Sequence, residues 1–109
     1  MTETPYRLVL STCPEMAVAE KIATALVEQR LAACVNIVPN LTSVYRWQGK
    51  IEKDNEILLL IKTTQQHYPS LETAIRQLHP YELPEILAVT VKEGLPDYLD
   101  WITTSLEKA

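Results

Sequence analysis

The stretch AACVNIVPNLTSVYRWQGKIE, residues 32–52, decides the fold of this chain. From Val35 to Trp47 it is rich in β-branched and aromatic residues, which predicts one long strand. Gln48-Gly49 supplies a tight reversal, and the following residues predict the returning strand, up to about residue 64. Thirteen extended residues span roughly 43 Å, whereas a compact domain of this size has a radius of gyration of only about 13 Å. The hairpin is therefore expected to overhang its own subunit, and a second copy of the chain is the simplest cover for it.

The flanking patterns complete the element order. The predicted strands are 5–12, 34–47, 50–64 and 84–92, and the predicted helices are 14–30, 68–78 and 95–106. Pro14 is expected to open the first helix, with Glu15 in its first turn. The order β-α-β-β-α-β plus a C-terminal helix predicts a ferredoxin-like α+β fold, with the first and third strands central in the sheet. Pro39 then lies on an edge strand, where its missing N–H is tolerated.

Composition limits the function classes. The 109 residues include 47% apolar residues, enough for one core, and residues 1–109 are expected to form a single domain. A net charge of −4 argues against nucleic-acid binding. No apolar run approaches the roughly 20 residues of a membrane helix, and no signal peptide is evident. Two cysteines without CxxC spacing favour a reducing cytoplasm, and two glycines exclude P-loops.

The loop HPYELPE supplies the candidate metal ligands. His79 is followed by Glu82 and Glu85, and imidazole with carboxylates suits Cu²⁺, Zn²⁺ or Ni²⁺. Alternatively, His79 caps the preceding helix. Cys13, at a predicted helix N-terminus, is expected to have a lowered pKa and to suit Cu(I), or to be a small loop residue. Cys34, on an apolar strand start, is expected in the core.

Aromatic and charged side chains suggest surfaces for contact. The aromatic set is interpreted as a subunit boundary or a ligand-stacking cage, and comprises Tyr45, Trp47, Tyr81, Tyr98 and Trp101. Of these, Tyr45, Trp47 and Trp101 are the predicted interface anchors. Alternating charges along the hairpin predict a solvated or salt-bridged face made of Lys50, Lys53, Lys62, Glu52, Asp54 and Glu56.

With these residues in hand, the chain resembles the CutA family of divalent-cation tolerance proteins. The matching segments are AACVNIVPNLTSVYRWQGKIE (32–52), EILLLIKTT (56–64), LHPYELPEI (78–86) and GLPDYLDWI (94–102). Asn40 departs from the family's usual glycine, but Asn tolerates positive φ. Ser11 stands where some members have cysteine. The resemblance implies a tight homotrimer held by the hairpins, binding of copper and other divalent cations, and likeness to the trimeric PII signalling proteins.

Two hypotheses follow. The first is a cytosolic homotrimer that binds divalent copper through His79, Glu85, Cys13 and Glu82 in metal tolerance. The second is a PII-like signalling or scaffold trimer whose inter-subunit clefts bind a small effector, such as an organic anion, or a partner protein. Arg46, Lys50 and Lys62 are candidates for contact with an anion. The chain has no catalytic motif, and an enzyme is not expected.

Overall fold

The computed structural model describes residues 4–107 and contains one antiparallel sheet flanked by helices. The strands are β1 (Tyr6–Cys13), β2 (Cys34–Trp47), β3 (Lys50–Thr64) and β4 (Leu87–Thr90), and the helices are α1 (Met16–Glu28), α2 (Tyr68–Leu78) and α3 (Pro96–Leu106). The strand order is β2-β3-β1-β4. The predicted α+β fold, the central positions of the first and third strands, and the edge position of Pro39 in β2 are therefore confirmed.

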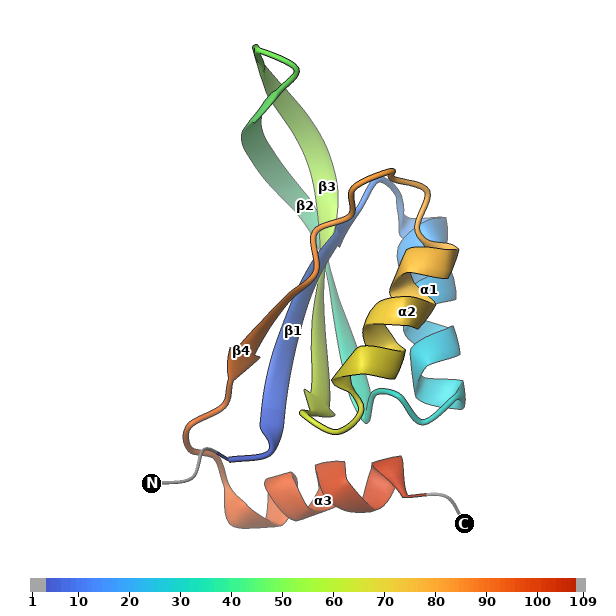
Figure 1. Cartoon of the computed structure of the whole chain (residues 1–109), viewed down its shortest axis with the longest axis vertical. Coiled ribbons are helices and arrows are strands. Elements are labelled where there is room, and N and C mark those ends of the chain that lie inside the picture. The colour runs from blue at the N-terminus through green and yellow to red at the C-terminus, as the bar shows by residue number, and fades with distance from the viewer. Residues whose placement is uncertain (1–3, 108–109) are drawn as a thin grey trace.

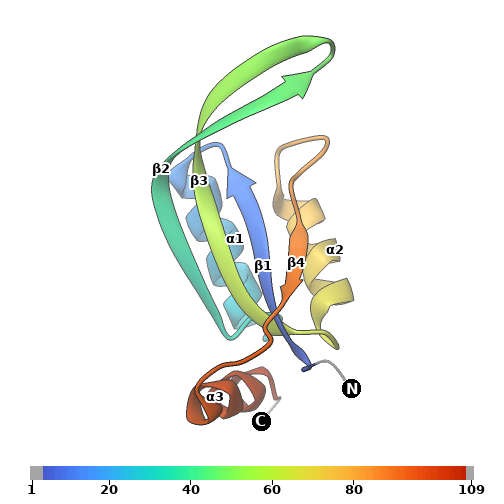
Figure 2. The same ribbon diagram turned by 90° about the vertical axis from the view of Figure 1, so that its left-hand side faces the viewer.

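The two faces of the sheet differ in their cover. Helices α1 and α2 lie against one face, where strand residues such as Val9 and Leu59 pack with Ile22 and Ile75 in a fully buried core. Figure 2 looks onto the other face, with α1 and α2 behind the sheet and α3 beyond one end of the strands. The strand pairing places six aliphatic side chains on this uncovered face: Leu8, Leu10, Leu58, Leu60, Leu87 and Val89.

The long hairpin of β2 and β3 projects beyond the helices, as Figure 1 shows, and it gives the chain a longest dimension of 44 Å. The pairing slips by a bulge between Val38 and Leu41, where Asn40 has a φ of 65°. At the tip, Gln48 and Gly49 both have positive φ, as a two-residue hairpin turn with a right-handed twist requires. The predicted overhang, the reversal at 48–49 and the tolerance of Asn40 for positive φ are confirmed.

The predicted bounds of two elements are wrong. Helix α1 begins at Met16, not at residue 14, because the chain is still extended at Glu15 (φ −153°, ψ 162°) after β1 has paired with β3 as far as Cys13. Glu15 is thus the N-cap and not a first-turn residue. Strand β4 has four residues instead of nine, since only Leu87–Thr90 pairs with β1. None of the helices within residues 4–107 is long and apolar enough to cross a membrane.

Candidate functional site

The loop after α2 returns to the end of β1 and is fixed there by His79. This side chain is buried, and its Nε2 donates to the carbonyl oxygen of Thr12 at 2.7 Å. Its Nδ1 accepts from the backbone N–H of Tyr81 at 3.1 Å. Because Nδ1 accepts a hydrogen bond, the proton of the neutral ring belongs on Nε2. His79 is the C-cap residue of α2, as the capping alternative proposed, but its ring bonds to β1 and not to the last helical carbonyls.

Tyr81 connects this loop to β3. Its hydroxyl donates to the Glu56 carboxylate at 2.9 Å, and its ring centroid lies 4.7 Å from that of His79. Burial raises the pKa of Tyr81, and the adjacent Glu56 carboxylate raises it further. Glu56 itself is only 6% exposed. The hairpin prediction placed it on a solvated or salt-bridged face, and this is wrong for Glu56.

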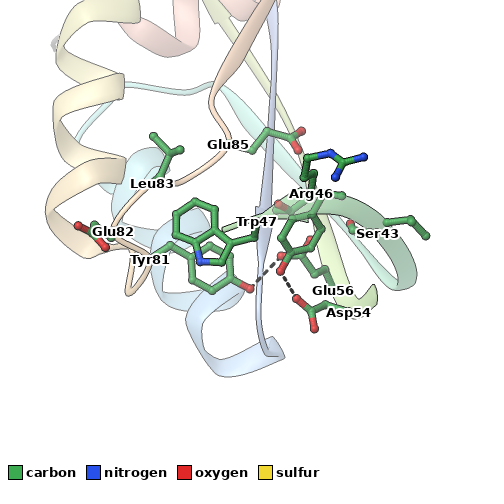
Figure 3. Close-up of a pocket in the computed structure, with 12 residues that line it drawn as sticks. Ser43, Arg46, Trp47, Asp54, Glu56, Tyr81, Glu82, Leu83 and Glu85 are labelled. Carbon is green, nitrogen blue, oxygen red and sulfur yellow. Dashed lines mark hydrogen bonds between the residues drawn. The ribbon is translucent and has the colours of Figure 1, made fainter. Parts of the chain in front are cut away.

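A cleft of about 650 Å³ opens between the outer half of the hairpin and this loop. The hairpin contributes Tyr45, Arg46, Trp47, Asp54 and Glu56 to its lining, and the loop contributes Tyr81, Glu82, Leu83 and Glu85. Tyr45 donates a hydrogen bond to Asp54, which raises the pKa of Tyr45 to about 12. In the view of Figure 3, Trp47 and Tyr81 lie between Glu82 on the left and the carboxylates of Asp54 and Glu56 on the right.

The structure brings some of the predicted metal ligands together. Glu82 and Glu85 are exposed and line the same cleft. His79 approaches the end of β1, as expected, but both of its ring nitrogens already have backbone partners. Glu85 lies two residues before β4 and not at its start. Among residues 4–107, no three His, Cys, Asp or Glu side chains are arranged so that they could hold a metal ion.

The two cysteines differ from their predictions. Cys13 is fully buried as the last residue of β1, and burial raises the pKa of its thiol to about 11. The expected lowering by a helix N-terminus is wrong, because α1 begins three residues later and desolvation of the thiolate dominates. Cys34 is partly exposed rather than buried in the core, and its sulfur lies 4.0 Å from Nζ of Lys62. Lys62 also donates to the side chain of Asn36.

The aromatic residues form two groups and not one. Tyr45, Trp47 and Tyr81 line the cleft near the hairpin tip. Tyr98 and Trp101 stack on each other on α3, with ring centroids 5.5 Å apart. Figure 1 shows α3 at the end of the sheet opposite the tip. Trp101 is 46% exposed, Trp47 is 41% exposed and Tyr45 is 40% exposed, so all three predicted anchors have surface left to bury.

The sequence interpretation missed Asp54 and Glu56 as members of the site. Glu56 directly precedes the apolar run Ile57–Ile61, and the position of a charged residue at the edge of such a run is a signal that its carboxylate can be buried. Its contact with Tyr81 joins residues 25 positions apart, which no local pattern reveals.

A four-stranded antiparallel sheet with a ferredoxin-like order of elements, an overhanging hairpin and an acidic, aromatic cleft defines a class of small α+β proteins. The family profile described as CutA1 divalent ion tolerance protein matches residues 7–105, and the chain belongs to this family. The predicted family resemblance is confirmed. The family is named for tolerance of divalent ions and not for a catalysed reaction.

Individual relatives agree with this assignment. A divalent-cation tolerance protein CutA from Thermus thermophilus is 57% identical over 95 residues, covering 87% of this chain and 92% of the relative. Protein CutA from Mus musculus is 52% identical over 91 residues, covering 84% of this chain but only 51% of the mouse protein. The chain thus spans about half the length of that relative. The crystal structure of CutA from Xylella fastidiosa superposes with a TM-score of 0.93 at 51% identity, covering 95% of this chain and all of the other.

Proposed function

We propose that this protein is a cytoplasmic homotrimer that binds divalent cations, with copper as its principal cation, and that it serves in tolerance of or response to metal ions. The observation that supports cation binding is the cleft, where the predicted ligands Glu82 and Glu85 are joined by Asp54 and Glu56. Carboxylate oxygens attract divalent cations, and four carboxylates share this lining with a single guanidinium, that of Arg46.

The four predicted ligands differ in how readily they can bind. Glu82 and Glu85 are exposed and need no rearrangement. His79 offers a lone pair only if Nδ1 gives up the N–H of Tyr81 or the ring turns away from Thr12. Cys13 must lose its proton inside the core. We therefore expect the carboxylates to capture the cation first and His79 to join when the loop rearranges, with Cys13 contributing least.

Titration calorimetry with CuCl₂ tests this assignment. The test variants are the Glu82→Gln/Glu85→Gln double variant and His79→Ala, each of which removes proposed ligands. Each should weaken Cu²⁺ binding by about tenfold or more, which corresponds to about 1.4 kcal/mol. Glu72→Gln is the matched control, since Glu72 on α2 accepts a tyrosine hydroxyl just as Glu56 does but lies outside the cleft. If the double variant and His79→Ala bind copper as tightly as the wild type does, the site lies elsewhere and the proposal is contradicted.

Trimer formation is supported by the uncovered sheet face. Leu10 pairs with Leu60 on one side and Leu87 on the other, which gives an aliphatic surface without a helix over it in residues 4–107. An exposed apolar patch of this kind marks an interaction surface. The overhanging hairpin, with Val44 and Ile51 more than 60% exposed, adds a second apolar surface. A second copy of the chain covers both in the proposed assembly, and light scattering measures the number of copies.

The cleft also favours the second hypothesis, a PII-like trimer with a small effector. Its volume of about 650 Å³ is suited to a small molecule. Of the residues considered for an anion, only Arg46 lines this cleft, whereas Lys50 and Lys62 do not. Indifference to CuCl₂ combined with binding of a metabolite would favour this hypothesis over the first.

A further inference from the structure

The cleft contains a buried carboxylate, that of Glu56, against which residues 4–107 place no side-chain cation. Glu56 is 6% exposed, and the only side-chain partner that the structure gives it within residues 4–107 is the hydroxyl of Tyr81. Buried carboxylates are normally paired with a cation or a metal, because desolvating an ion is costly. One neutral hydroxyl donates a hydrogen bond but no opposite charge. The Glu56 carboxylate is therefore expected to attract a positively charged ligand into the cleft.

The shape and the lining of the cleft favour an organic cation over a metal ion. The residues described do not bring three potential metal ligands to one point, so the carboxylates lie along the walls instead of converging. The walls between them are aromatic and include Tyr45, Trp47 and Tyr81. Aromatic rings attract alkylammonium and guanidinium groups through their π faces, and they cover the apolar stem of such a ligand. A bare metal ion would leave most of a 650 Å³ cleft unfilled.

The hydroxyl groups of the two tyrosines support the same conclusion. Tyr45 donates to Asp54 and Tyr81 donates to Glu56, so both hydroxyls are engaged and the positions of both rings are fixed. Each carboxylate keeps acceptor capacity beyond this bond, because an ionised carboxylate accepts about four hydrogen bonds. An ammonium group has three donors and can use the remaining acceptors.

We propose that this cleft binds an organic cation, with an alkylammonium group paired to Glu56 and Asp54 and its carbon stem against Tyr45, Trp47 and Tyr81 (Figure 3). The ligand is a free polyamine or the lysine side chain of a polypeptide, which present the same ammonium chemistry. This function goes beyond the proposed metal binding. Both ligands would use the same acidic cleft, but the charge partners of the organic cation are Glu56 and Asp54, whereas the metal-binding test changes His79, Glu82 and Glu85.

Calorimetry on the full chain with 1,5-diaminopentane tests the proposal, with uncharged 1,5-pentanediol as the matched ligand control. The diamine should bind and the diol should not. Glu56→Gln keeps the shape and the bond from Tyr81 but removes the charge, so it should weaken diamine binding at least about tenfold. Glu72→Gln, the equivalent change at the Tyr68–Glu72 pair outside the cleft, should leave the affinity unchanged. A blocked Gly-Lys-Gly peptide, titrated in parallel, distinguishes binding of a polypeptide lysine side chain from binding of a free polyamine.

Tyr81→Phe separates the role of charge from that of structure. It removes the hydrogen bond that Glu56→Gln keeps, and it leaves both the ring and the Glu56 charge, so diamine binding should be kept or strengthened. If Tyr81→Phe loses diamine binding as Glu56→Gln does, the charge of Glu56 does not bind the diamine without the bond from Tyr81, and the proposal is wrong. Failure of the wild type to bind either amine would also overturn it, whatever the result with CuCl₂.

Discussion

The uncovered sheet face yields the sharpest prediction. Leu87 on the edge strand β4 is 58% exposed and pairs with Leu10 on that face. Burying a leucine side chain completely contributes about 1.5–3 kcal/mol, so covering the exposed part of Leu87 contributes roughly 1–2 kcal/mol per subunit and roughly 3–6 kcal/mol in the proposed trimer. Leu87→Lys removes this contribution and places an ammonium group against an apolar partner, which adds a desolvation penalty. The proposed trimer should therefore dissociate in this variant at concentrations where the wild type stays assembled.

Size-exclusion chromatography with light scattering across a dilution series measures this dissociation. Val27→Lys is the matched control. Val27 is 44% exposed but lies on α1, which covers the other face of the sheet. Circular dichroism at each concentration checks that both variants are folded. A Leu87→Lys protein with the same mass as the wild type at every dilution would refute the role of this face. Equal dissociation of both variants would indicate a general loss of stability instead.

Two further predictions concern buried groups of β1. The hydroxyl of Ser11 is buried without a hydrogen-bond partner among residues 4–107, so Ser11→Ala should stabilise the fold by about 1 kcal/mol in urea unfolding, and a loss of stability would contradict this. The pKa of Cys13 is raised to about 11, so the contribution of its neutral thiol is fully present below about pH 9 and is lost as the pH rises toward 11. That loss should reach about 2–3 kcal/mol, and Cys13→Ala should flatten the decline in melting temperature between pH 9 and pH 11.

The sequence predicted the elements whose pattern is local and strong. The long hairpin followed from its β-branched residues and the Gln48-Gly49 reversal, and α1 from apolar residues at helical spacing. The apolar run Ile57–Ile61 is central in the sheet, as expected. Its residues face both sides of the sheet, with Leu58 and Leu60 on the uncovered one. A strand that is apolar on both faces is itself a signal that something covers both.

The errors arose where tertiary contacts override local signals. Helix α1 begins late because pairing with β3 keeps the chain extended through Cys13, and β4 is short because β1 offers it a partner over only four residues. The dipole argument for Cys13 failed because burial outweighs it. The cleft was not predictable, since its defining contact joins Glu56 and Tyr81 from separate elements.

A continuous chain of hydrogen bonds connects the two proposed cation sites. The carbonyl of Thr12 accepts from His79, whose Nδ1 accepts from the backbone of Tyr81, whose hydroxyl in turn donates to Glu56. A Cu²⁺ ion that takes the lone pair of Nδ1 displaces the Tyr81 N–H, and the ring that lies against His79 must then shift. This movement changes the position of the Tyr81 hydroxyl against Glu56.

Copper and 1,5-diaminopentane should therefore bind antagonistically. The loss of one hydrogen bond corresponds to about 0.5–1.5 kcal/mol, so saturation with CuCl₂ should weaken diamine binding roughly two- to tenfold. Thermodynamic linkage requires the diamine to weaken copper binding by the same factor. Calorimetry with copper added before the diamine, and then in the reverse order, measures both changes in affinity. In Tyr81→Phe the hydroxyl is absent, so this coupling should fall although both ligands still bind. Independent binding in the wild type would show that copper does not take the lone pair of His79 and would refute this antagonism.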